Sequence, residues 1–199
     1  MFNLKIIVMK KIFLMAVLVL SSVAMYAQHA VGSLNIQPRV GMNIANMTKS
    51  DGADSRIGLV AGAELEYQIS DIFSLSGGVL YSQQGCKVSD EDVKSTMKLD
   101  YINIPILANV YVVKNLAVKV GIQPGFNVNS SVKASAKGAS AEVDLDAKTF
   151  DFSIPVGLSY EFSNVVLDAR YNFGVTKVFD GSDSCNSVFQ IALGYKFSL

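Results

Sequence analysis

Charged side chains recur in this chain at alternate positions of segments whose other positions are apolar. Because successive side chains of a β-strand point to opposite faces, each of these charges lies on the face opposite the apolar one. Carboxylates and cations that share a face can form charge-assisted hydrogen bonds across neighbouring strands. The pattern therefore predicts a polar network made of Arg39, Glu64, Glu66, Lys119, Asp151, Glu161, Asp168, Arg170 and Lys196.

Residues suited to catalysis or metal binding are scarce. The only histidine, His29, precedes the first strand-like segment, which disfavours histidine-dependent catalysis and a histidine metal site. The acidic run Asp90-Glu91-Asp92 lacks the spacing of a calcium-binding loop, and we interpret it as a solvated loop. No glycine-rich phosphate motif opens a helix. We therefore expect a protein without enzymatic activity, cofactor or bound metal.

Cys86 and Cys185 are the only cysteines, and both fall in segments between predicted strands. A disulfide between them would persist in an oxidising compartment outside the cytoplasm. A bridge requires Cα atoms within about 7 Å of each other, which the sequence alone does not decide. A Cys86–Cys185 disulfide and two unlinked thiols are both compatible with the sequence.

The N-terminal residues have the order of regions of a secretory signal peptide. Two lysines and an apolar run occupy residues 10–20, and small residues follow them. The run is too short for a membrane-spanning helix, which needs about 20 residues. We expect residues 1–27 to be removed by cleavage after Ala27, with Ala24 as the alternative site and Met9 as an alternative start of the chain.

From residue 28 to residue 199 the dominant hydrophobic period is two, and no amphipathic helix of useful length is apparent. Residues 165–175 and 189–199 show this most clearly, since every second position in each is apolar. We therefore expect a single all-β domain. The same alternation predicts eight strands, at residues 36–47, 57–69, 72–84, 97–112, 116–130, 149–162, 165–175 and 189–199.

The predicted connections alternate in length. Short turns at residues 70–71, 113–115 and 163–164 suit tight hairpins. The other connections are long and polar, at residues 48–56, 85–96, 131–148 and 177–187. Short periplasmic turns and long extracellular loops are typical of bacterial outer-membrane barrels, so we expect both mature termini on the periplasmic side.

The placement of charge decides which face of each strand meets which solvent. An arginine or lysine that faced lipid would cost about 2 to 4 kcal/mol near the bilayer midplane. Continuous apolar rows facing water would exceed what a soluble monomer tolerates. The sequence therefore predicts an eight-stranded antiparallel up-and-down transmembrane β-barrel with a polar interior. Aromatic residues near the short turns fit an interfacial girdle, and they are Tyr67, Phe73, Tyr160, Phe162, Tyr195 and Phe197.

Three prolines fall inside predicted strands, where a missing N–H group interrupts the hydrogen-bond ladder. Pro105, Pro124 and Pro155 each lie about eight to ten residues from a short turn, which is close to the roughly 9 to 11 residues that cross a bilayer. We therefore expect them to mark β-bulges where the strands leave the membrane.

Several short motifs recur in the order of a known family. They are Tyr101-Ile102-Asn103-Ile104-Pro105, Val120-Gly121-Ile122-Gln123-Pro124-Gly125, Asp168-Ala169-Arg170-Tyr171-Asn172-Phe173-Gly174 and Leu193-Gly194-Tyr195-Lys196-Phe197. Together they resemble the PorT-like outer-membrane β-barrel family of Bacteroidetes, whose members are often labelled porins. The resemblance implies an outer-membrane location and raises the role of an accessory subunit of a secretion system. The ending with Gly194, Phe197 and Leu199 also resembles the signal that barrel-assembly machinery recognises.

The leading functional hypothesis is a non-enzymatic envelope protein that acts through its four long loops. Its expected partners are outer-membrane lipid, the barrel-assembly machinery during insertion, and an envelope or extracellular molecule bound by the loops. A formal charge of zero argues against nucleic acid. The alternatives are a narrow porin for small solutes and the secretion-system subunit, although eight strands leave an interior that side chains fill.

Overall fold

The computed structural model describes residues 30–49, 52–89, 94–136 and 139–199. The predicted signal peptide, His29 and the acidic run 90–92 lie outside these residues. No helix within the described ranges is long and apolar enough to cross a membrane. The regular elements of the described chain are β1 (Leu34–Met47), β2 (Asp54–Ser70), β3 (Phe73–Ser89), β4 (Lys94–Asn103), β5 (Ile106–Val113), β6 (Leu116–Ala136), β7 (Ala139–Asp144), β8 (Phe150–Phe162), β9 (Val165–Lys177), β10 (Cys185–Tyr195) and β11 (Phe197–Ser198).

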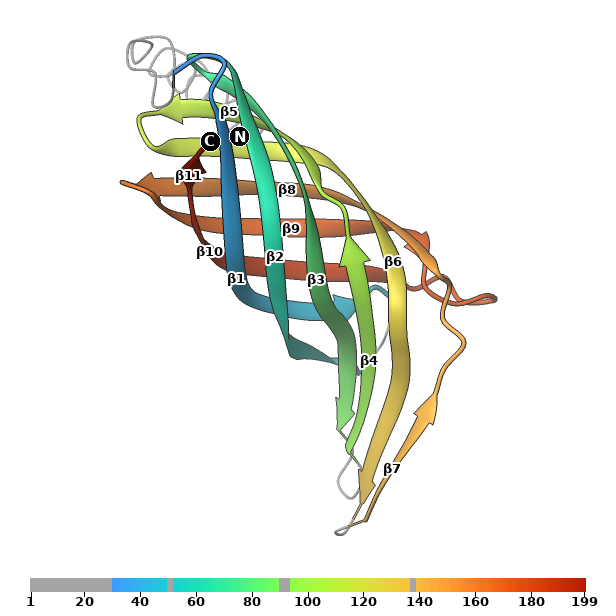
Figure 1. The fold of residues 1–199 in the computed structure, drawn as a ribbon. Helices are drawn as coiled ribbons and strands as arrows, with labels where there is room; N and C mark the ends of the chain where they lie inside the picture. Colours follow the sequence, from blue (N-terminus) through green and yellow to red (C-terminus); the bar gives the residue numbers. More distant parts are fainter. Residues whose placement is uncertain (1–29, 50–51, 90–93, 137–138) are drawn as a thin grey trace, which may run out of the picture.

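Antiparallel pairing closes these strands into a barrel (Figure 1). β1 pairs with β2 on one side and with β10 on the other, so the first and last long strands meet. β4 and β5 are two parts of one predicted strand, because both pair with β3 and with β6. β11 continues β10 beyond Lys196 and also pairs with β1. The ring therefore has eight strands, as the sequence predicts.

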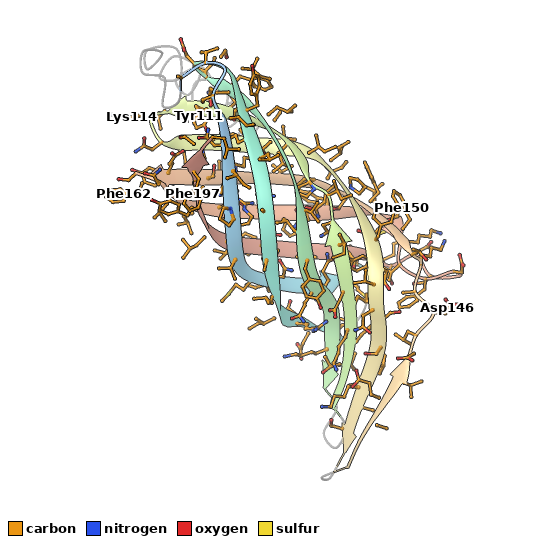
Figure 2. All side chains as sticks on the ribbon, in the orientation of Figure 1. Tyr111, Lys114, Asp146, Phe150, Phe162 and Phe197 are labelled. Atoms are coloured by element: carbon orange, nitrogen blue, oxygen red, sulfur yellow. The ribbon has the colours of Figure 1, made fainter. Side chains whose placement is uncertain are left out.

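The short turns gather at one end of the barrel. Asn115 and Ser163 have positive φ angles of 71° and 55° in the β5–β6 and β8–β9 turns, a backbone conformation common in tight hairpins. The described chain also begins and ends here, since the N–H of Gly32 donates to Gln68 and the N–H of Leu199 donates to Leu34. Phe162 and Phe197 lie at the same end as Tyr111 and Lys114 (Figure 2).

Side chains alternate in burial along the barrel strands. In β8, Asp151 and Glu161 are buried, whereas Ile154, Val156 and Leu158 are exposed. The same alternation repeats around the ring, so polar side chains fill the interior and apolar side chains cover the outer surface. This is the arrangement that a lipid-embedded barrel requires.

The prolines do not mark β-bulges, contrary to the prediction. Pro105 lies in the gap between β4 and β5, but the register with β3 is the same on both sides of it. Pro124 and Pro155 keep the register of β6 with β8. The register shift between β4 and β6 lies at Asp100 and Tyr101, nearer the long loops. The carbonyl groups of Pro105 and Pro124 still accept hydrogen bonds, so each proline removes a single donor.

Three barrel strands continue well past the ring. Residues 85–89 of β3, 94–99 of β4 and 130–136 of β6 stay paired and, together with β7, form what we call the projecting sheet (Figure 1). The sequence-based prediction of loops at residues 85–96 and 131–148 is therefore wrong for much of both segments. Pairing with a neighbouring strand outweighs the weak strand propensity of their serine, alanine and lysine residues.

Candidate functional site

Five of the predicted network residues meet in the middle of the barrel. We call Arg39, Glu64, Lys119, Asp168 and Arg170 the central cluster; they come from β1, β2, β6 and β9, and all are buried. Glu64 Oε1 lies 2.8 Å from Arg39 Nη1 and 3.0 Å from Arg170 Nη1. One carboxylate oxygen thus joins guanidinium groups from β1 and β9, two strands that are separated in the ring by β10.

Asp168 is the centre of this cluster. Its two carboxylate oxygens accept hydrogen bonds from Nε and Nη2 of Arg170, at 2.7 and 2.9 Å. Lys119 Nζ lies 2.9 Å from Oδ2, and Arg39 Nη2 lies 3.4 Å from the same oxygen. For a buried carboxylate surrounded by three cations, charge-assisted hydrogen bonds offset the free-energy cost of removing the carboxylate from water.

Glycines on neighbouring strands leave room for these long side chains. A Cβ atom added at Gly78 would lie 2.6 Å from Cγ of Glu64, and one added at Gly157 would lie 2.6 Å from Cβ of Arg170. Both glycines are the direct cross-strand partners of the residues they accommodate. The width of the lumen at this level therefore depends on residues without a side chain.

A second ionic group lies toward the short turns. Lys196 Nζ contacts Glu161 Oε2 at 2.8 Å and Glu66 at 3.2 Å. Tyr111 donates its hydroxyl hydrogen to Glu66 at 2.5 Å, and Ser74 donates to the same oxygen at 2.9 Å. We call Glu66, Tyr111, Glu161 and Lys196 the turn-end cluster. It accounts for three further predicted network residues.

Asp151 stands apart from both ionic clusters. Its Oδ1 accepts hydrogen bonds from Thr176 Oγ1 and Asn186 Nδ2, each at 3.1 Å. Asn186 also donates to the hydroxyl of Tyr101 at 3.2 Å. The structure therefore joins Asp151 to neutral partners near the long-loop end, where sequence reasoning grouped it with the charged network.

An apolar group lies at the long-loop end of the barrel. Met47, Cys86, Leu99, Tyr101 and Val178 are buried against one another, and we call them the mouth cluster. Phe179 packs against them from the segment after β9. Sequence reasoning missed this cluster because it assigned only polar residues to the interior. The signal was present, since Met47 continues the alternation of buried Arg39 and Asn43 along β1.

A charged pair beside the mouth was also missed. Arg56 Nη1 lies 3.8 Å from Asp100 Oδ1, and Tyr81 donates its hydroxyl hydrogen to Asp100 Oδ2 at 2.9 Å. Arg56 also donates to the backbone carbonyl of Gln84. Arg56 keeps the even-numbered alternation of Glu64 and Glu66 in β2, which could have identified it as an inward residue.

Cys86 and Cys185 are free thiols in this structure, so the predicted candidate disulfide is not formed. Cys86 is buried in the mouth cluster, with its Sγ atom 3.9 Å from Sδ of Met47. The Sγ atom of Cys185 lies 3.8 Å from the carbonyl oxygen of Val175 and 4.0 Å from that of Asp183. The two side chains thus have separate environments.

We expect a thiol reagent to modify Cys185 and to spare Cys86 in the folded protein. Burial shields the Cys86 sulfur and raises the pKa of its thiol, which lowers the fraction of reactive thiolate. Mass spectrometry after brief treatment with a membrane-impermeant maleimide measures both rates. Unfolding in denaturant should make the two rates similar, and equally fast labelling of both residues in the folded state would contradict the buried position of Cys86.

No group of three His, Cys, Asp or Glu residues in the described ranges is placed to hold a metal ion.

Comparison with known proteins agrees with this geometry. A family model described as "Outer membrane protein beta-barrel domain" matches residues 26–180. Neisserial surface protein A is 17% identical over 82% of this chain and 97% of its own, with a TM-score of 0.53. The attachment invasion locus protein Ail of Yersinia pestis, solved with the heparin analogue sucrose octasulfate, is 15% identical over 84% of this chain and 99% of its own, with a TM-score of 0.51.

These solved structures share the barrel fold at low identity, and no curated protein matches the sequence. The match of the family model extends over most of the chain and includes β1 to β9. The chain therefore belongs to the outer membrane protein beta-barrel domain family, and its apolar outer surface lies in the outer membrane.

Proposed function

We propose that this protein is a non-enzymatic interaction protein of the bacterial envelope, in which a sealed barrel holds the projecting sheet and the long loops outside the membrane. The observation that carries the proposal is the filled lumen. The turn-end, central and mouth clusters follow one another along the barrel axis, and their members are largely buried. A filled lumen leaves the parts beyond the ring as the surface available to a partner.

The proposed orientation places the short turns and both mature termini in the periplasm. The projecting sheet and the long loops then face the extracellular side, as in other outer-membrane barrels. During insertion, the last strand would be presented to the barrel-assembly machinery. Tyr195 and Phe197 suit that role because both are outward-facing and exposed.

We expect the refolded protein to give no step conductance in a planar lipid bilayer. Asp168 and Arg170 are among the least exposed residues of the chain, and the mouth cluster adds a second barrier above them. Single-channel recording with a known porin as positive control measures this. Reproducible conductance steps from folded protein would overturn the sealed-barrel proposal and support the narrow porin instead.

Photo-crosslinking in native membranes tests the interaction role. Lys133 and Val143 are both exposed in the projecting sheet. A photoreactive amino acid at either position should form a crosslink to a partner, and excess unlabelled protein should reduce the yield of that crosslink. The same amino acid at Lys114, in the β5–β6 turn, serves as the control for the opposite end. A captured secretion component would identify the accessory role that the PorT-like resemblance raises. If no position on the projecting sheet or the loops gives a crosslinked product that excess unlabelled protein reduces, the proposal is overturned.

A further inference from the structure

β7 is the outermost strand of the projecting sheet (Figure 1). It pairs with β6 through residues 139–144, and within the described chain no strand pairs with its other side. The N–H group of Leu145, directly after β7, donates to the carbonyl oxygen of Ser130 in β6 at 2.9 Å. Because successive residues of an antiparallel strand turn their backbone groups to opposite sides, the N–H and C=O groups of Glu142 and Asp144 point away from β6.

This edge lacks three of the features that protect exposed strands from pairing with other chains, and its only charged side chains are the carboxylates of Glu142 and Asp144. Edges are commonly protected by proline, lysine or a β-bulge. β7 contains neither residue type, and its register with β6 is unbroken from Ala139 to Asp144. Residues 141–144 are all exposed. The edge is thus a regular row of accessible backbone donors and acceptors.

The two faces of β7 differ in chemistry. Val143 is 65% exposed on one face, and its cross-strand partner Val132 lies on the same face. Glu142 and Asp144 lie on the other face, where Lys98 Nζ contacts Glu142 at 2.7 Å and Lys133 is the cross-strand partner of Glu142. Asp146 extends the acidic character just beyond the strand, at the end of the molecule far from Lys114 (Figure 2).

We propose that β7 binds an extended segment of a partner protein, which adds to the projecting sheet as a further strand. Backbone hydrogen bonds to Glu142 and Asp144 would supply the pairing. Basic side chains of the segment would face the carboxylates of these residues, and its apolar side chains would lie beside Val143. This inference rests on the proposed interaction role and assigns that role a site and a class of ligand.

A basic amphipathic segment fits this edge better than a second copy of the chain. If two copies paired through β7, Glu142 and Asp144 of one would share a face with the same carboxylates of the other. Like charges directly across a strand pair are destabilising. A segment that alternates lysine or arginine with valine or isoleucine instead places opposite charges across the new strand pair.

The test uses the full-length protein in nanodiscs and a fluorescent peptide that alternates lysine and valine. Fluorescence anisotropy should show saturable binding. The same peptide with N-methyl groups on its edge-facing amides should bind about tenfold more weakly, since it loses backbone hydrogen bonds. A peptide that alternates glutamate and valine should not bind. Equal affinity of the methylated and unmethylated peptides would overturn strand addition.

Two substitutions at one position separate backbone pairing from charge. Asp144→Asn removes the carboxylate and should lower the affinity for the lysine–valine peptide about threefold. Asp144→Pro also removes an outward N–H group without taking a donor from the β6–β7 ladder, and should weaken binding about tenfold. With an uncharged serine–valine peptide, only the proline variant should lose affinity. Identical effects of both variants on both peptides would contradict the proposal.

Amide hydrogen exchange provides a second measurement. Bound peptide should slow exchange at Glu142 and Asp144, while the amide of Leu145, already bonded to Ser130, should change little. If the peptide does not bind and yet photo-crosslinking from the projecting sheet still captures a competed partner, the edge proposal fails while the interaction role stands. Failure of both experiments would remove the interaction role as well.

Discussion

Replacing Asp168 by asparagine should lower the free energy of unfolding by about 3 to 5 kcal/mol. The substitution keeps the size of the side chain but removes the carboxylate that contacts Arg39, Lys119 and Arg170. Glu64 would then be the one remaining anion of the central cluster, opposite three buried cations. Urea unfolding of the folded barrel, followed by far-UV circular dichroism or by gel mobility, measures the loss, since the chain contains no tryptophan for fluorescence.

Asp183→Asn is the matched control for this experiment. Asp183 contacts Lys177 at 2.6 Å and Lys49 at 3.6 Å, but all three side chains are exposed near the long-loop end. Water already screens this ion pair, so no measurable change in stability is expected. The double variant Asp168→Asn/Lys119→Met removes one cation together with the anion and should recover part of the loss. Similar small effects of Asp168→Asn and Asp183→Asn would contradict a stabilising central cluster.

The architecture of the barrel could be predicted from side-chain alternation alone. A period of two with charges on one face requires strands that have one wet and one apolar surface. In β8, for example, Asp151 and Glu161 fall on the predicted inward face, and Leu158 falls on the outward one. Lipid outside and ion pairs inside follow from the energetic cost of the reverse arrangement.

The specific ion pairs could not be predicted in the same way. The sequence places Arg39, Glu64 and Glu66 in one network and does not decide which of the two glutamates contacts Arg39. The structure pairs Arg39 with Glu64 and gives Glu66 to Lys196. The stagger between strands decides this choice, and closure of the barrel sets that stagger through all eight strand pairings together. No single strand carries that information.

The projecting sheet and the mouth cluster were not predicted from the sequence, and the reason again lies in the surroundings of these residues. Residues beyond the membrane do not contact lipid, so their outward side chains need not be apolar. In the projecting sheet the alternation is reversed, with apolar side chains on the inward face and polar side chains on the outward face. The inward row Cys86, Met97 and Val132 is apolar, whereas Lys87 and Lys133 lie on the outward face. A search for apolar rows that face outward therefore treats these segments as irregular loops.

An arginine in place of Leu158 should lower stability by about 2 to 4 kcal/mol in phospholipid vesicles. Leu158 is 49% exposed on the outer surface, and its cross-strand partners Val118 and Ala169 share that face. It follows Gly157, the partner of Arg170 in the central cluster, so it lies near mid-height of the barrel. A cation there must remain in hydrocarbon or distort the bilayer, because the lumen on the inner side is already filled.

Val143→Arg introduces the same charge at a position that is more exposed but lies in the projecting sheet. Its stability should match that of the unmodified protein, since water surrounds the new cation. Comparing the stability changes of Leu158→Arg and Val143→Arg therefore distinguishes exposure to lipid from exposure to water. Accessible surface area alone does not distinguish them. If both variants lose the same stability, the outer surface at Leu158 does not face hydrocarbon, and the assignment of the apolar belt to the membrane fails.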